Sequence, residues 1–116
     1  MVLTSTVFGK TEVEWSKELS ETIFPGEAEY RLPDGTRIDI LTEDACWEVE
    51  WCSHKVYESI GQALYYQAST GKQGGVILLI GKDAFKQELV WYLRCLTMCT
   101  EANIKIKTFN TNERGK

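Results

Sequence analysis

The sequence predicts a single α/β (α+β) domain, residues 1–116, in which helices flank a central mixed sheet. Three observations lead to this prediction. The length of 116 residues suits one domain with one core. The hydrophobic fraction of 43% is typical of a globular protein. Stretches with helical and strand periodicity follow one another in the order αβββαβαβ, which is typical of a sheet with helices on both faces.

The first predicted helix follows residues 1–9, a segment without clear periodicity that we interpret as a loose arm or an added strand. Thr11 is the predicted N-cap, and Glu14 completes a capping box three residues later. The helix is expected to run to about Thr22, before Pro25 and Gly26 end it. Its expected buried stripe consists of Trp15, Leu19 and Ile23.

Three strands and a helix are predicted next. Residues 29–32 and 36–41 should form a hairpin around the turn at Asp34–Gly35, and residues 46–52 alternate in polarity as a third strand does. Helical periodicity then extends over residues 53–70. The expected apolar stripe of this helix is Val56, Ile60, Ala63 and Leu64.

The last part of the chain predicts two more strands around a helix. Glycine-rich residues 70–75 form a connection, and the continuous apolar run 76–80 predicts a central strand buried on both faces. Asp83 should cap a helix that extends to about residue 100. Its expected buried stripe is Phe85, Leu89, Leu93 and Leu96, flanked by Trp91 and Tyr92. Residues 104–107 alternate as an edge strand with lysines outward, and the polar tail 110–116 is expected to fray.

Three carboxylates are expected to gather on two adjacent strands. Alternation leaves Asp39 on the face opposite Ile38 and Ile40, and it places Glu48 and Glu50 together on one face. Like charges this close destabilise a fold unless a cation lies between them. Oxygen ligands suit Mg²⁺ or Mn²⁺. The alternative interpretation is a solvated acidic face on a hairpin.

The following helix brings further polar groups to the carboxylates. Lys55, Ser59, Gln62 and Tyr66 recur along one helix edge. An Asp on one strand, Glu-x-acid on the next and Gln-x-x-x-Tyr on a helix together resemble the PD-(D/E)XK nuclease superfamily. The spacing of Gln62 and Tyr66 is similar to that of the RecB-like branch. The resemblance covers residues 12–82.

The resemblance implies a restriction-endonuclease-like fold and a Mg²⁺- or Mn²⁺-dependent site that hydrolyses phosphodiester bonds in DNA. It implies metal ligation by Asp39, Glu48 and Glu50, with a glutamate of the first helix as a further ligand. Glu12 fits that role best and Glu18 is the second choice. The expected catalytic residues are Asp39, Glu48, Glu50, Lys55, Gln62 and Tyr66, and the expected nucleic-acid contacts are Lys55, Gln62 and Tyr66.

The sequence departs from the superfamily at Glu50, where a lysine is usual. We therefore expect Lys55 to supply the missing positive charge. The resulting function is an endonuclease or exonuclease, with branched or single-stranded DNA among the candidate substrates. Two alternatives remain open: a catalytically inactive nuclease-like module for DNA binding or assembly, and a small interaction domain whose acidic face only keeps it in solution. The net charge of −4 indicates that the chain is not a tight, non-specific duplex binder.

Cysteine usage and the absence of targeting signals predict an intracellular, cytoplasmic protein without a membrane partner. Cys46, Cys52, Cys95 and Cys99 form no Cys-x-x-Cys pair, and His54 is the single histidine, so we reject a zinc site. Cys95 and Cys99 are expected to be small buried hydrophobic residues. The aromatic residues Trp51 and Tyr57 are candidate contacts for a homodimer.

Overall fold

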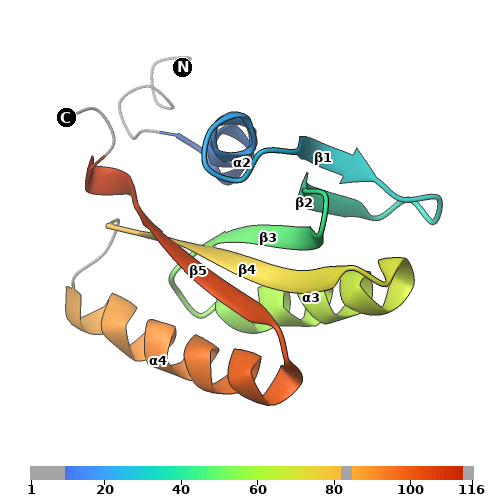
Figure 1. Ribbon diagram of the computed structural model, residues 1–116. Helices are drawn as coiled ribbons and strands as arrows, with labels where there is room; N and C mark the ends of the chain where they lie inside the picture. Colours follow the sequence, from blue (N-terminus) through green and yellow to red (C-terminus); the bar gives the residue numbers. More distant parts are fainter. Residues whose placement is uncertain (1–9, 82–84, 114–116) are drawn as a thin grey trace.

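A five-stranded mixed sheet forms the centre of the molecule, in a computed structural model that describes residues 10–81 and 85–113 (Figure 1). The strand order is β1-β2-β3-β4-β5; β1, β2 and β3 pair antiparallel, whereas β3, β4 and β5 pair parallel. The predicted fold class, a mixed sheet flanked by helices, is confirmed. In chain order the elements are α2 (Glu12–Glu21), β1 (Glu27–Arg31), β2 (Arg37–Leu41), β3 (Ala45–Trp51), α3 (Val56–Thr70), β4 (Gln73–Ile80), α4 (Phe85–Ala102), β5 (Lys105–Asn110) and a 3₁₀ turn (Thr111–Glu113).

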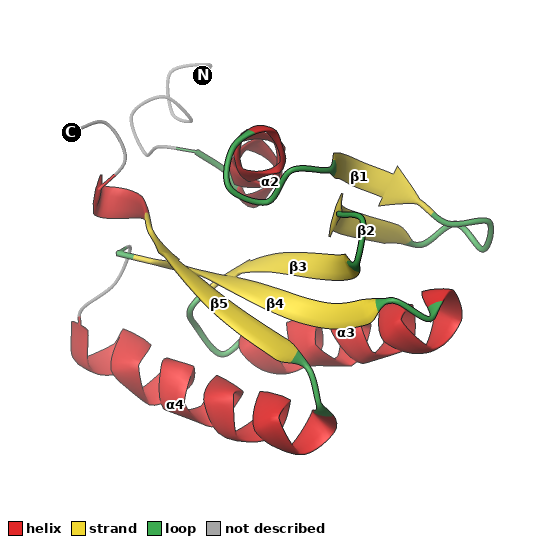
Figure 2. Ribbon diagram, in the orientation of Figure 1, coloured by secondary structure: helices red, strands yellow, loops and turns green. Residues whose placement is uncertain are grey.

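Helix α2 covers one face of the sheet, while α3 and α4 cover the other (Figure 2). Strand β4 lies between these layers and is buried on both sides, as its apolar run predicted. Successive side chains of β4 point alternately to the two helical layers. Val76 and Leu78 join the cluster under α3 and α4, and Ile77 and Leu79 join the cluster under α2.

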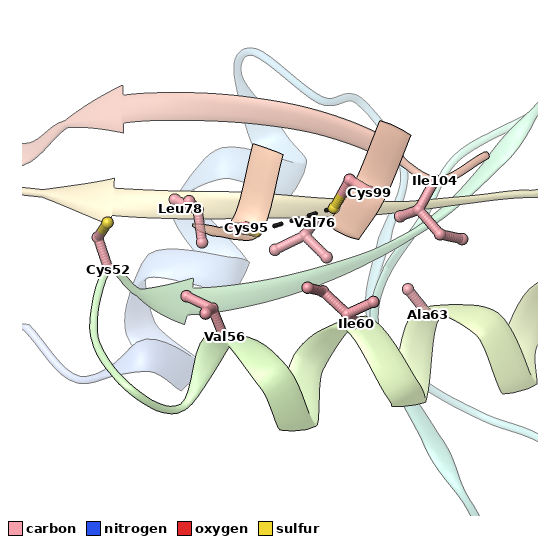
Figure 3. Packing of buried hydrophobic residues seen from close by; sticks show 9 residues of the cluster. All are labelled: Cys52, Val56, Ile60, Ala63, Val76, Leu78, Cys95, Cys99 and Ile104. Atoms are coloured by element: carbon pink, nitrogen blue, oxygen red, sulfur yellow. Dashed lines mark hydrogen bonds between the residues drawn. The ribbon is translucent and has the colours of Figure 1, made fainter. Parts of the chain in front are cut away.

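The cluster under α3 and α4 consists of aliphatic residues and thiols (Figure 3). Val56, Ile60 and Ala63 point from α3 toward β4. All four cysteines are buried free thiols, and the Sγ atoms of Cys95 and Cys99 lie 3.8 Å apart. The prediction that Cys95 and Cys99 fill the core as small hydrophobic residues is confirmed.

The predicted start of α2 is confirmed, and the predicted end of its buried stripe is wrong. The Glu14 amide donates to Thr11 Oγ1 at 3.2 Å, and the Thr11 amide donates to Glu14 Oε1 at 2.8 Å, which completes the capping box. Trp15 and Leu19 are buried, but Ile23 is 56% exposed. The helix ends at Glu21, so helical spacing no longer directs the Ile23 side chain toward the core.

The predicted buried stripes of the later helices contain further errors. Leu64 on α3 is 40% exposed, and on α4 Leu89 and Leu93 are 41% and 51% exposed. Helix α4 instead turns Cys95 and Cys99 into the core and leaves Trp91, Tyr92 and Leu96 half-buried. Apolar residues occur on both sides of α4, so periodicity alone chose the wrong side. The segment 1–9, the predicted cap Asp83, the predicted burial of Phe85 and residues 114–116 lie outside what the structure describes.

The last strand lies at an edge of the sheet, as predicted, but the tail after it does not fray at once. Strand β5 is longer than expected and runs to Asn110. Thr111 Oγ1 then donates to the Ile80 carbonyl at 2.9 Å, and Asn112 Nδ2 donates to the Gly81 carbonyl at 3.4 Å. These bonds hold the 3₁₀ turn against the end of β4.

No helix within residues 10–81 and 85–113 combines the length and the apolar character that a bilayer crossing requires.

Gly75 on β4 is packed against the ring of Trp47 on β3. A Cβ at this position would lie 2.5 Å from Trp47 Cζ3. Gly75→Ala should therefore lower the free energy of unfolding by about 1–3 kcal/mol, the usual cost of overpacking a core. Gly61→Ala is the matched control: a Cβ there meets nothing within 4 Å, and alanine should stabilise α3 by about 0.5–1 kcal/mol. Urea unfolding measures both, and equal effects would contradict this packing.

Candidate functional site

Strands β2 and β3 separate where the predicted carboxylates begin. They pair only at Ile40 with Trp47 and at Leu41 with Cys46. Beyond these pairs the backbone of β3 bonds to a side chain of β2: the Val49 amide donates to Asp39 Oδ2 at 2.8 Å. The divergence of the two strands opens a space between them and helix α3.

This space is a cavity of about 230 Å³, which we call the carboxylate cavity. Residues from α2, β2, β3 and α3 and from the turn before α3 line it. They are Glu12, Arg37, Asp39, Glu48, Val49, Glu50, Lys55, Glu58 and Gln62. The structure thus brings six predicted site residues to one cavity. Glu18 does not line it and instead pairs with Lys10.

Four of the five carboxylates that line the cavity form two groups. Glu50 Oε1 accepts from Ser59 Oγ at 3.1 Å, and its Oε2 lies 3.2 Å from the Trp51 amide. The same amide lies 3.4 Å from Glu12 Oε2, so Glu12 and Glu50 share a donor. Asp39 and Glu48 form the other group, in which the charge of Asp39 disfavours ionisation of Glu48.

Glu48 is the least satisfied of these side chains. It is 5% exposed, and its Oε2 is buried without a hydrogen-bond partner in the described part of the chain. Burial and the nearby Asp39 charge raise the pKa of Glu48 to about 9. Burial also raises the pKa of Asp39 to about 6, although the bond from the Val49 amide opposes this. Burial and hydrogen bonding with Glu12 raise the pKa of Glu50 to about 8.

These raised pKa values make the stability of the metal-free protein depend on pH. A carboxyl whose folded-state pKa is raised stabilises the fold below its unfolded pKa, 4.5 for Glu48, and this contribution is lost as pH rises through the folded value. In EDTA the free energy of unfolding should therefore fall as the pH rises from about 5 to about 9, by up to about 1.4 kcal/mol per pH unit for Glu48, whereas Asp39 contributes only up to about pH 6 and Glu50 only up to about pH 8. Urea unfolding across this range measures the slope. Glu48→Gln should reduce it, and a flat profile would contradict the burial of these acids.

The donor set fits a hard divalent cation held by two carboxylates. Among the described residues, no three Asp, Glu, His or Cys side chains stand close enough to hold one ion, so a shared site of Asp39, Glu48, Glu50 and Glu12 does not exist in this arrangement. Mg²⁺ commonly takes only one or two protein carboxylates and keeps several waters. Asp39 and Glu48 supply two, and the unpartnered Glu48 Oε2 is a buried oxygen that a cation would satisfy.

Tyr66 lies behind the cavity and does not line it. Its ring is 4% exposed and packs with Ile38 and Cys46. Its hydroxyl donates to the Arg37 carbonyl at 2.6 Å, and burial raises its pKa to about 12. Tyr66 therefore fixes the strand that carries Arg37 and Asp39. Its predicted contact with nucleic acid stays a prediction, as do the roles of Lys55 and Gln62.

Sequence reasoning missed Arg37 and Glu29. Arg37 lines the carboxylate cavity, and its Nε lies 3.1 Å from Glu29 Oε1. Its charge lowers the pKa values of Asp39 and Glu48 and so partly offsets the effect of burial. Strand alternation could have revealed Arg37, which precedes Asp39 by two residues on the same strand. Glu29 was hidden because its φ of 59° interrupts the regular strand geometry of β1.

A second, larger cavity of about 370 Å³ adjoins the carboxylate cavity, and we call it the side cavity. The two share Glu12, Glu50 and Lys55. The remaining lining residues of the side cavity are Trp51, Cys52, Ser53 and Glu88. Trp51, a predicted dimer contact, is thus half-buried and faces a cavity, whereas Tyr57 is 45% exposed and packs edge-on against Trp91.

Comparison with protein-family models, curated proteins and solved structures gave no match for this chain.

Proposed function

We propose that this chain is a Mg²⁺- or Mn²⁺-dependent deoxyribonuclease that hydrolyses phosphodiester bonds. The observation that carries the proposal is the carboxylate cavity, in which Asp39 and Glu48 meet in a buried polar site and Glu48 Oε2 has no partner among the described residues. Buried charges are stable only when a counter-ion or hydrogen bonds compensate them, and a divalent cation would do so here. The resemblance of the strand and helix motifs to PD-(D/E)XK nucleases supports the same function.

Each side chain has a separate role in this proposal. Asp39 and Glu48 would hold the ion, which when bound lowers the pKa of a coordinated water and stabilises negative charge on the phosphate. Glu50, fixed by Ser59, would orient the attacking water and accept its proton. Lys55 would contribute positive charge near the phosphate, and Gln62 would hold the water or a nucleotide.

A second candidate function is an inactive nuclease-like module that binds DNA or assembles on it. The position of Glu50 favours this candidate, because the superfamily usually has a lysine there. Glu50 is 7% exposed and bonded to Ser59, so its carboxyl group already has a structural role.

Incubation with single-stranded, duplex and branched DNA in Mg²⁺, Mn²⁺ or EDTA separates these functions. Cleavage that appears with either metal and disappears in EDTA is the expected result. Binding without cleavage under any condition would favour the inactive module. Failure both to bind and to cleave would overturn both functions and leave an interaction domain with an acidic face.

A further inference from the structure

Arg37 is the basic residue on the strand wall of the carboxylate cavity. It lines the cavity from β2, two residues before Asp39. Its Nε lies 3.1 Å from Glu29 Oε1, and 44% of its side chain is exposed. Its Nη1 and Nη2 amino groups have no hydrogen-bond partner in the described part of the chain. One edge of the guanidinium is therefore held by Glu29, and the end with the two amino groups is left for a ligand.

The charge of Arg37 acts on the carboxylates of the proposed metal site. It lowers the pKa values of both Asp39 on β2 and Glu48 on β3, against the larger effect of burial. Among the described residues that line the carboxylate cavity, Arg37 and Lys55 are the two basic ones. A phosphate in this cavity would therefore meet Arg37 on the β2 wall and Lys55 on the wall next to α3.

Glu29 holds Arg37 at a cost to the fold. The residue pairs on either side of it in β1 and β2 place Glu29 opposite Asp39. Its φ of 59° is unfavourable for any residue with a Cβ atom. Its Oε2 is also buried without a hydrogen-bond partner among the described residues, which is a second cost. Unfavourable features that coincide at one residue indicate a functional constraint, and the contact of Glu29 with Arg37 is the candidate.

We propose that Arg37, positioned by Glu29, binds the scissile phosphate of the DNA strand in the carboxylate cavity. This role rests on the proposed nuclease function and deepens it, since the resemblance to PD-(D/E)XK nucleases implies no role for either residue. The free Nη1 and Nη2 groups match two oxygens of one phosphate, a geometry that a lysine ammonium does not offer. Because both groups belong to the chain, this contact with DNA forms without a metal ion.

Binding measured in EDTA tests this inference without any cleavage. Fluorescence anisotropy would follow a labelled 12-nucleotide single strand, and the same sequence as a duplex, over a series of NaCl concentrations. Arg37→Ala should weaken binding about 10- to 100-fold, the range for one charge-assisted contact. It should also reduce the slope of log K against log [NaCl] by about 0.7 for the single strand or about 0.9 for the duplex, the share of one phosphate.

Two further variants show whether this effect belongs to the guanidinium of Arg37. Arg37→Lys keeps the charge, so it should keep the salt slope and recover only part of the affinity. Arg31→Ala is the matched control, because Arg31 is exposed on the neighbouring strand β1 and lines neither cavity. It should leave both the affinity and the salt slope at the values of the parent. Circular dichroism melting confirms that each variant is folded.

A pair of variants at Glu29 tests its positioning role. Glu29→Ala and Glu29→Gln remove the same negative charge, but only glutamine keeps an oxygen that can accept from Arg37 Nε. DNA binding should therefore be about 3- to 10-fold weaker in Glu29→Ala than in Glu29→Gln, the range for one hydrogen bond. Equal affinities of the two variants would show that Glu29 does not position Arg37.

The outcomes distinguish this inference from the proposed function. An unchanged affinity and salt slope in Arg37→Ala, or no binding of either DNA in EDTA, would overturn the inference even if the protein cleaves DNA. A lower melting temperature of Arg37→Ala with an unchanged salt slope would show that the ion pair with Glu29 is structural. Binding that depends on Arg37, in a protein that never cleaves with Mg²⁺ or Mn²⁺, would support the phosphate contact and overturn only the nuclease activity.

Discussion

Replacing Glu48 with glutamine should lower metal-dependent DNA cleavage by about 1,000-fold or more, since a bound metal ion supplies several kcal/mol of transition-state stabilisation. Glu48 carries the buried oxygen without a partner among the described residues, and its neutral amide would no longer attract a cation. The metal-free variant should be at least as stable as the parent at pH 8, because burial and the Asp39 charge make Glu48 take up a proton on folding, whereas glutamine is neutral without one. Single-turnover cleavage and thermal melting in EDTA measure the two effects.

Two further variants separate metal binding from folding. Glu101→Gln removes the same charge from an exposed position on α4 and should change neither property. Asp39→Asn keeps an oxygen that can accept from the Val49 amide, so this variant should retain its melting temperature. It should lose cleavage, because asparagine lacks the charge that would hold the cation. A strong loss of stability in Asp39→Asn would show that the carboxylate is structural and would count against a functional site.

Lys55→Ala should lower cleavage about a hundredfold, the scale observed when one transition-state electrostatic contact is removed. Lys55 precedes α3, lines both cavities and is exposed, so its removal should leave the fold intact. Lys55→Arg should restore part of the rate if charge alone matters. Lys107→Ala on the exposed edge of β5 is the matched control and should cleave at the parent rate.

A substitution at Glu50 tests further whether the positive charge of Lys55 is needed for cleavage. Glu50→Lys restores the usual superfamily pattern and should make cleavage less dependent on Lys55. If Lys55→Ala cleaves at the parent rate in single-turnover experiments, Lys55 has no such role. Arg37, which lines the same cavity beside Glu29, would then be the cation to substitute next.

The sequence was most informative where side-chain period and burial agree. Alternation along β3 correctly placed Glu48 and Glu50 together, and helical spacing correctly brought Gln62 to the same cavity. The buried strand β4 was also predicted correctly, because a continuous apolar run of that length is typical of a strand that is buried on both faces.

Other features depend on contacts between distant segments and left no local pattern. Helix α4 carries apolar residues on two sides, and only the sheet beneath it decides that Cys95 and Cys99 face inward while Leu93 faces solvent. The ion pair of Arg37 with Glu29 depends on an irregular residue in β1, and the division of the acids into two groups depends on how far β2 and β3 diverge.

That divergence also divides the sheet into parts of unequal local stability. The β1–β2 hairpin is joined to β3 through only two residue pairs, whereas β4 is paired along its length on both sides. Local opening of the hairpin breaks few backbone bonds to β3, exposes Ile38 and Ile40, breaks the bond from the Tyr66 hydroxyl to the Arg37 carbonyl, and leaves the core under α3 and α4 untouched. Amide protons of β2 should thus exchange with deuterium well before those of β4. The wall that carries Asp39 can then move away from the wall that carries Glu48, so the carboxylate cavity can widen while the rest of the protein stays folded.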